Sequence, residues 1–242
     1  MTAALTLDVD WAPDFMIDAA ADALLAREVR ATWFVTHASA AIDRLRERPD
    51  LFELGIHPNF LAGSSHGETP QDVVAHCLAL VPEARAVRTH CLLQSTPLHD
   101  ALLEGGRIEV DVSLFLPRAR SVEPVVQHSP GGRLLRLPYV WQDNMEMYSP
   151  DPLWDVGALL DGAGPRIFDF HPVHVWLNSA AFAPYERMKQ AGPLPQIAPQ
   201  ETARYRNSGT GTMTAFLDLA DRLAATGGGA RICDLSAEAV GA

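Results

Sequence analysis

The first half of the chain alternates short apolar runs with longer stretches in which apolar residues recur every three or four positions. Short apolar or β-branched runs are typical of buried strands, and the longer period is typical of amphipathic helices. The pattern predicts strands over Ala3–Leu7, Ala31–Val35, Leu51–Ile56, Ala86–Arg88 and Ile108–Val112, and helices over Phe15–Arg27, Ala40–Arg48, Pro70–Leu80 and Pro97–Leu103. Strands that alternate with helices indicate a parallel sheet covered by helices.

The second half of the chain is less regular. The stretch Leu114–Pro150 is rich in Pro and Gly and holds one predicted strand, Leu134–Leu137. Beyond it the pattern predicts strands over Arg166–Phe170 and Ala230–Leu235, and helices over Trp154–Leu160, Tyr185–Gln190 and Gly211–Ala225. No repeat or low-complexity tract interrupts the pattern. We therefore expect residues 1–242 to form a single α/β domain, a barrel or an incomplete barrel.

Charge and composition exclude several classes of partner. The net charge of −11 disfavours nucleic acid and anionic membranes as partners. Three cysteines without a CxxC pair indicate neither a disulfide framework nor a zinc ribbon. The N-terminus lacks the pattern of a signal peptide, and no apolar run approaches the ~18 residues of a membrane span. The sequence predicts a cytoplasmic protein without a membrane span, and leaves a homo-oligomer open.

Ionisable residues follow five of the predicted strands. They are Asp8 and Asp10, His57, Arg88 and His90, Asp111, and Asp169 and His171. Chance placement would scatter such residues over helix faces instead. In parallel α/β folds the chemistry collects at the carboxyl ends of the strands, so this placement predicts one site at that edge of the sheet.

Asp8 and Asp10 lie two residues apart, so on an extended strand their side chains point the same way. Two carboxylates on one face repel each other unless a cation or a shared proton lies between them. A single Asp here could simply cap the helix that begins near Asp14. The pair is better explained by a metal site or by acid–base chemistry.

Four histidines are candidates for the same site. His57 and His66 flank a loop that contains Gly and Ser, and together with an Asp they suit a metal site with positions open for water and substrate. His171 and His174 lie three residues apart, and their ordinary interpretation is one buried structural histidine and one at the surface. The aspartate pair favours the functional interpretation for at least part of this set.

The remaining polar residues near these segments have simpler interpretations. Arg88 and His90 are separated by one residue, so both side chains can point towards the site. Cys91 lacks an evident base to activate it, and we expect a buried thiol. Asp143 and Glu146 belong to an irregular stretch, and we expect them to be solvated or to cap a helix.

Six segments resemble the motifs of a known family, and they occur in the order of that family. They are Leu7–Asp14, Ala31–His37, Leu54–Phe60, Arg88–Ser95, Asp111–Phe115 and Phe168–His174. The family is that of the polysaccharide deacetylases (NodB homology, carbohydrate esterase family 4), in particular a branch associated with surface-polysaccharide (O-antigen type) biosynthesis clusters. The resemblance implies a distorted (β/α) barrel with about seven parallel strands.

The resemblance also implies roles for individual residues. Asp8 resembles the general base and Asp10 the metal-binding aspartate of the family. His57 matches the first metal histidine, Arg88 the arginine that orients the base, and His171 the catalytic acid. The implied cofactor is a divalent metal, with zinc expected and cobalt, nickel or iron open.

The chain departs from the family pattern at the second metal histidine. That histidine usually follows the first by four residues, but position 61 is Leu, so we expect His66 to replace it as a metal ligand. Four further residues are candidates for binding substrate: His90, Trp11, Asp111 and His174.

The predicted activity is removal of an acetyl group from an amino sugar or a polysaccharide precursor by a metal-dependent hydrolase. The substrate would be a small molecule or an oligosaccharide. Two alternatives stay open, namely hydrolysis of a small non-sugar C–N amide on the same fold and a non-catalytic carbohydrate-binding protein. A nicotinamide-binding fold is excluded because no GxGxxG motif follows the first strand.

Overall fold

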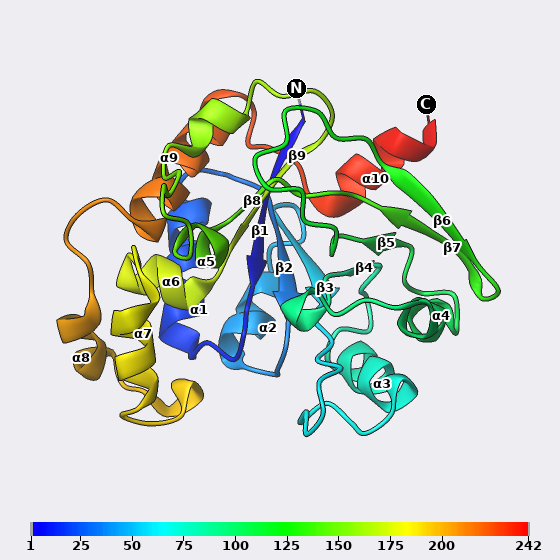
Figure 1. The fold of residues 1–242 in the computed structure, drawn as a ribbon, viewed down its shortest axis with the longest axis horizontal. Coiled ribbons are helices and arrows are strands. Elements are labelled where there is room, and N and C mark those ends of the chain that lie inside the picture. Colours follow the sequence, from blue (N-terminus) through cyan, green and yellow to red (C-terminus); the bar gives the residue numbers. More distant parts are fainter. Residues whose placement is uncertain (1, 242) are drawn as a thin grey trace.

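Nine strands form a single curled sheet in the computed structural model, which describes residues 2–241 (Figure 1). The strands are β1 (Ala3–Asp8), β2 (Ala31–Val35), β3 (Phe52–Ile56), β4 (Ala86–Val87), β5 (Val110–Asp111), β6 (Val125–Ser129), β7 (Gly132–Arg136), β8 (Trp141–Gln142) and β9 (Arg166–Phe170). Their order across the sheet is β6-β7-β5-β4-β3-β2-β1-β9-β8. Among the strand pairs of residues 2–241, only β6–β7 is antiparallel. This half-barrel confirms the predicted α/β class.

Helices cover the convex face of the sheet and fill the connections between strands. They are α1 (Asp14–Leu25), α2 (Ala40–Arg46), α3 (Pro70–Leu80), α4 (Thr96–Leu103), α5 (Asp143–Glu146), α6 (Pro172–Leu177), α7 (Phe182–Lys189), α8 (Pro199–Thr202), α9 (Thr212–Ala225) and α10 (Ile232–Gly241). Short 3-10 turns lie at η1 (His90–Leu92), η2 (Val156–Leu159), η3 (Leu194–Gln196) and η4 (Ala203–Tyr205). None of the helices in residues 2–241 combines the length and apolar character that crossing a membrane requires.

The two faces of the sheet have different compositions. Every residue of β1 is buried, because alternate side chains pack against the helices and into the barrel interior. Leu5 and Leu7 belong to the large core on the helix side, whereas Ala4 belongs to a smaller core inside the barrel. Thr6 and Asp8 share the inner face with Ala4 because side chains alternate along a strand. The interior therefore changes from apolar to polar towards the carboxyl ends of the strands.

The C-terminal helix α10 closes the amino end of the half-barrel. Ile232 and Leu235 are buried in the inner core, and the backbone N–H of Ile232 donates to Thr32 Oγ1 at 2.9 Å. Figure 1 shows this helix beside the starts of the strands. The inner core is thus shielded from solvent on the side opposite the polar strand ends.

Two predictions about the strands were wrong. The sheet has nine strands rather than about seven, because the irregular middle of the chain contains the β6–β7 hairpin and the two-residue β8. The predicted strand Ala230–Leu235 is instead the start of α10, and only Ala230 makes a bridge, to Ala4. The buried residues Ile232 and Leu235 are three apart, which is a helical spacing rather than a strand spacing.

The buried contact of α10 gives a prediction for stability. Ile232→Ala removes a fully buried side chain from the inner core, so we expect the free energy of unfolding to fall by about 2 to 4 kcal/mol. Urea denaturation measures the change. The control is Val126→Ala, because Val126 is 49% exposed, and its effect should lie within about 0.5 kcal/mol. Equal effects of the two substitutions would show that α10 does not seal the barrel.

Candidate active site

The structure brings several of the predicted side chains together at one edge of the sheet. Asp8 is the last residue of β1, His57 follows β3, Arg88 follows β4, and His171 follows β9. These strands run parallel, so their carboxyl ends meet at the edge that lies lowest in Figure 1. The site is therefore built from neighbouring strand ends, as the strand-end rule for parallel sheets requires.

A fully buried arginine organises the inner part of the site. Arg88 Nη1 donates to Asp8 Oδ1 and to Thr6 Oγ1, both at 2.9 Å, and also to Asp169 Oδ1. Arg88 Nε donates to the carbonyl of Val112 at 3.0 Å. Burial alone would lower the pKa of Arg88, but Asp169 and Asp8 outweigh burial and raise it. The guanidinium is thus charged and fixed in place.

Asp169 is a second carboxylate on the same guanidinium. It is fully buried, Thr6 Oγ1 donates to its Oδ1 at 3.0 Å, and its Oδ2 has no partner within residues 2–241. Burial raises the pKa of Asp169 well above its ordinary value, although Arg88 opposes this shift. Asp8 and Asp169 therefore both bind Arg88 Nη1 at the base of the site.

Asp10, His57 and His90 form a second group of side chains, next to Asp8. Asp10 Oδ1 lies 3.1 Å from His57 Nε2 and 3.0 Å from His90 Nδ1, and the two ring nitrogens are 3.2 Å apart. Burial would raise the pKa of Asp10, but its bonds to both histidines lower it well below the ordinary value. Burial would lower the pKa of His57, but Asp8 and Asp10 raise it. One carboxylate and two imidazoles that converge in this way are a donor set typical of divalent transition metals.

The sequence suggested that Asp8 and Asp10 lie on one face of an extended strand, but in the structure they do not. The strand ends at Asp8, and both Asp10 and Trp11 are left-handed, with φ of 45° and 54°. The backbone N–H of Trp11 donates to Thr36 Oγ1 at 3.0 Å, which fixes this turn. A left-handed pair of non-glycine residues is costly and is often found at functional sites. Here it sends the two carboxylates to different partners.

The structure does not bring His66 into the Asp10 group. His66 Nε2 donates to the carbonyl of Thr36 at 2.9 Å, and its Nδ1 accepts from the backbone N–H of Asn59 at 3.2 Å. Both ring nitrogens are thus used to fold the loop between β3 and α3 back onto β2. His90, which we had assigned to substrate, lies beside Asp10 and His57.

His171 is bound by Asp143, an acid that we had expected to be solvated or to cap a helix. His171 Nδ1 lies 2.7 Å from Asp143 Oδ1, and its backbone N–H donates to Asp143 Oδ2 at 2.9 Å. Burial would lower the pKa of His171, but Asp143 raises it well above the ordinary value. The other nitrogen, Nε2, lies 3.6 Å from Asp10 Oδ2. His171 therefore lies beside the Asp10 group, and Asp143 favours its protonated form.

Asp143 and Glu146 were expected to be solvated or to cap a helix, and the first of these alternatives was wrong. Asp143 is fully buried, and Glu146 is 4% exposed and accepts bonds from Arg118 Nε at 3.2 Å and Leu153 N at 2.7 Å. The strand β8, which places Asp143 next to His171, is only two residues long. A strand of two residues is too short to show the alternation of polar and apolar residues from which a strand is predicted.

Three other predicted residues lie close by in different environments. The ring of Trp11 packs between His66 and His90, with ring centroids 5.5 and 5.2 Å away. His174 is buried, its Nδ1 lies 3.1 Å from Ser179 Oγ, and burial lowers its pKa to about 4. Asp111 accepts from Arg136 Nε at 2.7 Å and from Ser113 N at 3.0 Å, so both of its oxygens have partners within the protein.

Cys91 is exposed, not buried as we expected. It lies in η1 directly after His90, with a left-handed φ of 55°. Burial of part of the side chain, together with the negative charge of Asp10, raises the pKa of its thiol. A protonated thiol is a weak nucleophile, so covalent catalysis by Cys91 is disfavoured.

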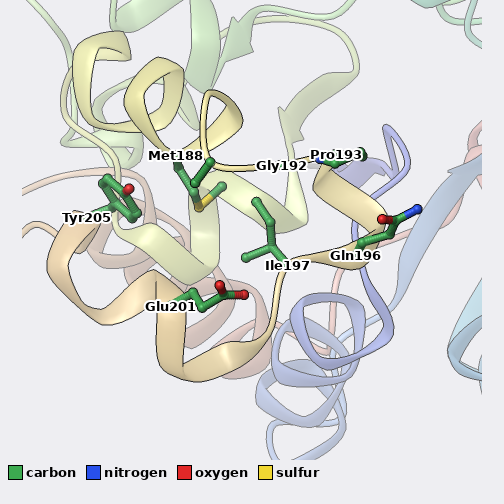
Figure 2. Close-up of a pocket in the computed structure, with 8 residues that line it drawn as sticks. Met188, Gly192, Pro193, Gln196, Ile197, Glu201 and Tyr205 are labelled. Atoms are coloured by element: carbon green, nitrogen blue, oxygen red, sulfur yellow. The ribbon is translucent and has the colours of Figure 1, made fainter.

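A cavity of about 200 Å³ lies in a different part of the molecule (Figure 2). It is lined by the end of α7 and the turns that follow it, including Met188, Pro193, Ile197, Glu201 and Tyr205. Glu201 is the only acidic side chain in the lining, and its Oε2 accepts from Ala198 N at 2.9 Å. None of the residues of the strand-end site contributes to this cavity, so it offers no comparable chemistry.

The half-barrel carries Asp, His and Arg side chains together at its carboxyl edge, and comparison with known proteins identifies the family. The family model of WbmS-like polysaccharide deacetylases matches residues 5–189. The chain therefore belongs to the WbmS-like polysaccharide deacetylase family, which confirms the resemblance of its motifs.

Two solved structures illustrate the similarity. A candidate polysaccharide deacetylase involved in O-antigen biosynthesis (WbmS) from Bordetella bronchiseptica is 31% identical, with a TM-score of 0.78, over 91% of this chain and 90% of that chain. A 4-alpha-glucanotransferase from Thermococcus litoralis is 10% identical, with a TM-score of 0.55, over 98% of this chain and 38% of that chain, and shares the fold alone. No curated protein sequence matches the chain significantly.

The donor geometry gives a prediction for metal affinity. His90→Ala should weaken Zn²⁺ binding more than about 100-fold, because even residues behind the ligands contribute 10- to 100-fold in metal sites. His66→Gln should bind within about threefold of the unchanged protein, since Gln can keep the bond to Thr36. Competition with a chromophoric chelator measures both affinities. A larger loss in His66→Gln than in His90→Ala would show that His66, and not His90, is the metal ligand.

The low pKa of His174 gives a prediction for stability against pH. The folded pKa of about 4 lies below the ordinary value of 6.5, so the unfolded chain binds the proton first. We expect the free energy of unfolding to decrease as the pH falls from 6.5 to 4, by about 3 kcal/mol from this group. His174→Asn, which keeps a partner for Ser179, should lose this part of the decrease. Identical pH profiles from urea denaturation would contradict the assignment.

Proposed function

We propose that the protein is a metal-dependent deacetylase that removes an acetyl group from an amino sugar of a polysaccharide or of its precursor. The observation that carries the proposal is that two side chains with fixed positions, Asp8 and His171, flank one group of possible metal ligands. Asp8 is fixed by Arg88 and His171 is fixed by Asp143, and both lie beside Asp10, His57 and His90. Membership of the polysaccharide deacetylase family supports the substrate class.

The metal would be held by Asp10, His57 and His90. Their donor atoms lie within 4.8 Å of one another, and one carboxylate with two imidazoles leaves positions open for water and substrate. When bound, a divalent ion, with zinc expected and cobalt, nickel or iron as alternatives, supplies a water of lowered pKa and polarises the acetyl carbonyl. The chain lacks the second histidine at position 61, and His90 supplies the missing donor.

Asp8 is the group that we assign to accept the proton of the attacking water. Arg88 binds Asp8 Oδ1, and within residues 2–241 no group donates a hydrogen bond to Asp8 Oδ2. The guanidinium thus orients the carboxylate while one oxygen stays available. A positioned base of this kind typically contributes ~10²- to 10⁴-fold to a rate.

His171 is the group that we assign to protonate the leaving amine. Asp143 binds Nδ1 and raises the pKa of the ring, which favours a proton on Nε2 that can be donated to the leaving nitrogen. In the reaction a C–O bond forms between water and the acetyl carbon, and the C–N bond breaks. One proton passes from water to Asp8, another passes from His171 to the nitrogen, and the products are acetate and an amine.

Two substitutions test the roles assigned to Asp8 and His171. Asp8→Asn removes the base and Asp143→Asn removes the charge that holds the His171 proton, so each should lower kcat for acetate release by ~10²- to 10⁴-fold. The bound metal should remain near one equivalent in both variants. The matched control is Asp221→Asn, which alters a surface acid 65% exposed and should keep kcat within about twofold. Undiminished acetate release by Asp8→Asn would refute the mechanism.

A further inference from the structure

A row of aromatic rings runs from His171 to the surface of the molecule. The ring of His171 lies 5.6 Å from that of His174, which lies 5.8 Å from Phe182 and 4.8 Å from Tyr185. Phe182 in turn lies 4.3 Å from Tyr148, with the two planes tilted by 32°. We call His174, Phe182, Tyr185 and Tyr148 the aromatic wall. The mechanism proposed above uses none of these four side chains.

The outer end of the wall is open to solvent. Tyr148 is 71% exposed, more than any other exposed large apolar side chain within residues 2–241. Met145, on the same turn of chain, is 45% exposed. An aromatic ring at this exposure gains little from folding, and together with Met145 it leaves apolar surface that a ligand can contact.

The turn that carries Tyr148 is held in place. Tyr148 N donates to the carbonyl of Met145 at 3.2 Å, and Ser149 N donates to the carbonyl of Glu146 at 3.0 Å. The buried carboxylate of Glu146 accepts bonds from Arg118 and from Leu153 N. The same turn begins at Asp143, the partner of His171. The backbone that carries Tyr148 therefore has a fixed position relative to His171.

The other side of the wall belongs to α7. Phe182 is the first residue of this helix, and Tyr185 follows one turn later. Tyr185 Oη makes no hydrogen bond to another group within residues 2–241, and burial followed by the negative charge of Asp10 raises the pKa of Tyr185. Tyr185 packs against His174 in the aromatic wall, and its phenol is available to bond with a ligand.

The chemistry of the reaction determines which part of the substrate contacts the aromatic wall. The nitrogen that His171 protonates stays on the sugar, whereas the acetyl carbon leaves as acetate. The sugar must therefore lie on the His171 side of the reacting amide. The apolar faces and hydroxyl edges of a sugar ring suit side chains with an apolar body and a polar tip, such as Tyr148 and Tyr185.

We propose that Tyr148 and Phe182 form a subsite for a sugar unit next to the one that carries the acetyl group. This inference rests on the proposed function and deepens it, because it makes the substrate a chain of sugars rather than a single one. Tyr148 lies two ring contacts beyond His174, further from the reacting amide than the sugar that bears it. A monosaccharide would leave this end of the wall empty.

Kinetics on substrates of two lengths test the subsite. The probes are N-acetylglucosamine and its β-1,4-linked tetramer, and acetate release is measured. Tyr148→Ala should raise the ratio of the tetramer KM to the monosaccharide KM about tenfold, with kcat for the tetramer within about twofold. Tyr148→Phe keeps the ring and should restore most of the affinity. Val126→Ala changes an apolar side chain 49% exposed on β6 and should leave both KM values unchanged.

An unchanged KM ratio in Tyr148→Ala, or a fall in kcat in place of the rise in KM, would overturn the subsite. So would a change of oligomeric state in gel filtration, because the ring would then contact another protein molecule.

Calorimetry separates the failure of the subsite from the failure of the proposed function. The Asp8→Asn protein should bind the tetramer, and addition of Tyr148→Ala should weaken this binding about tenfold. If the unchanged protein releases no acetate but its tetramer affinity still depends on Tyr148, the subsite stands and deacetylation fails. If Asp8→Asn does not bind the tetramer, the subsite is refuted whatever the activity.

Discussion

A guanidinium buried inside a half-barrel is the constraint on which the site depends. An unpaired charge in such a place is strongly destabilising, so every strand around Arg88 must supply an acceptor or a packing surface. Strands β1 and β9 supply Asp8, Thr6 and Asp169, and the residue after β5 supplies a carbonyl. The rings of Phe34 and Tyr139 lie 4.7 and 4.6 Å from the guanidinium carbon. The inner face of the barrel is thus assembled around one cation, and the same bonds orient Asp8.

Fixing Asp8 inside the barrel has a consequence for Asp10. If β1 continued as a strand, both carboxylates would share the field of Arg88. The left-handed turn at Asp10 and Trp11 instead directs the second carboxylate to His57 and His90. Thr36 holds that turn through its hydroxyl, and its carbonyl accepts the bond from His66. His66 therefore contributes to the site indirectly, by fixing the loop after β3 against the segment that Asp10 follows.

The sequence was informative where the fold repeats a long pattern. Strand–helix alternation predicted the parallel strands, and the strand-end rule selected Asp8, His57, Arg88 and His171 before their positions were known. It could not choose between His66 and His90, because loop conformation decides which imidazole reaches Asp10 and spacing does not encode it. Asp143 was missed because its contact with His171 depends on the two-residue strand β8. The exposure of Cys91 likewise follows from a left-handed backbone that composition does not reveal.

The least regular stretch of the chain thus controls the leaving-group side of the proposed reaction. Asp143 and Tyr148 are five residues apart on one turn, which Arg118 and Leu153 N fix through Glu146. Asp143 binds His171 and raises its pKa, and Tyr148 is the residue that we assign to a neighbouring sugar. Because a single rigid turn carries both, a change that shifts this turn would alter proton donation and sugar contact together. The base and the metal-type donors, which are attached to β1, β3 and β4, would keep their places.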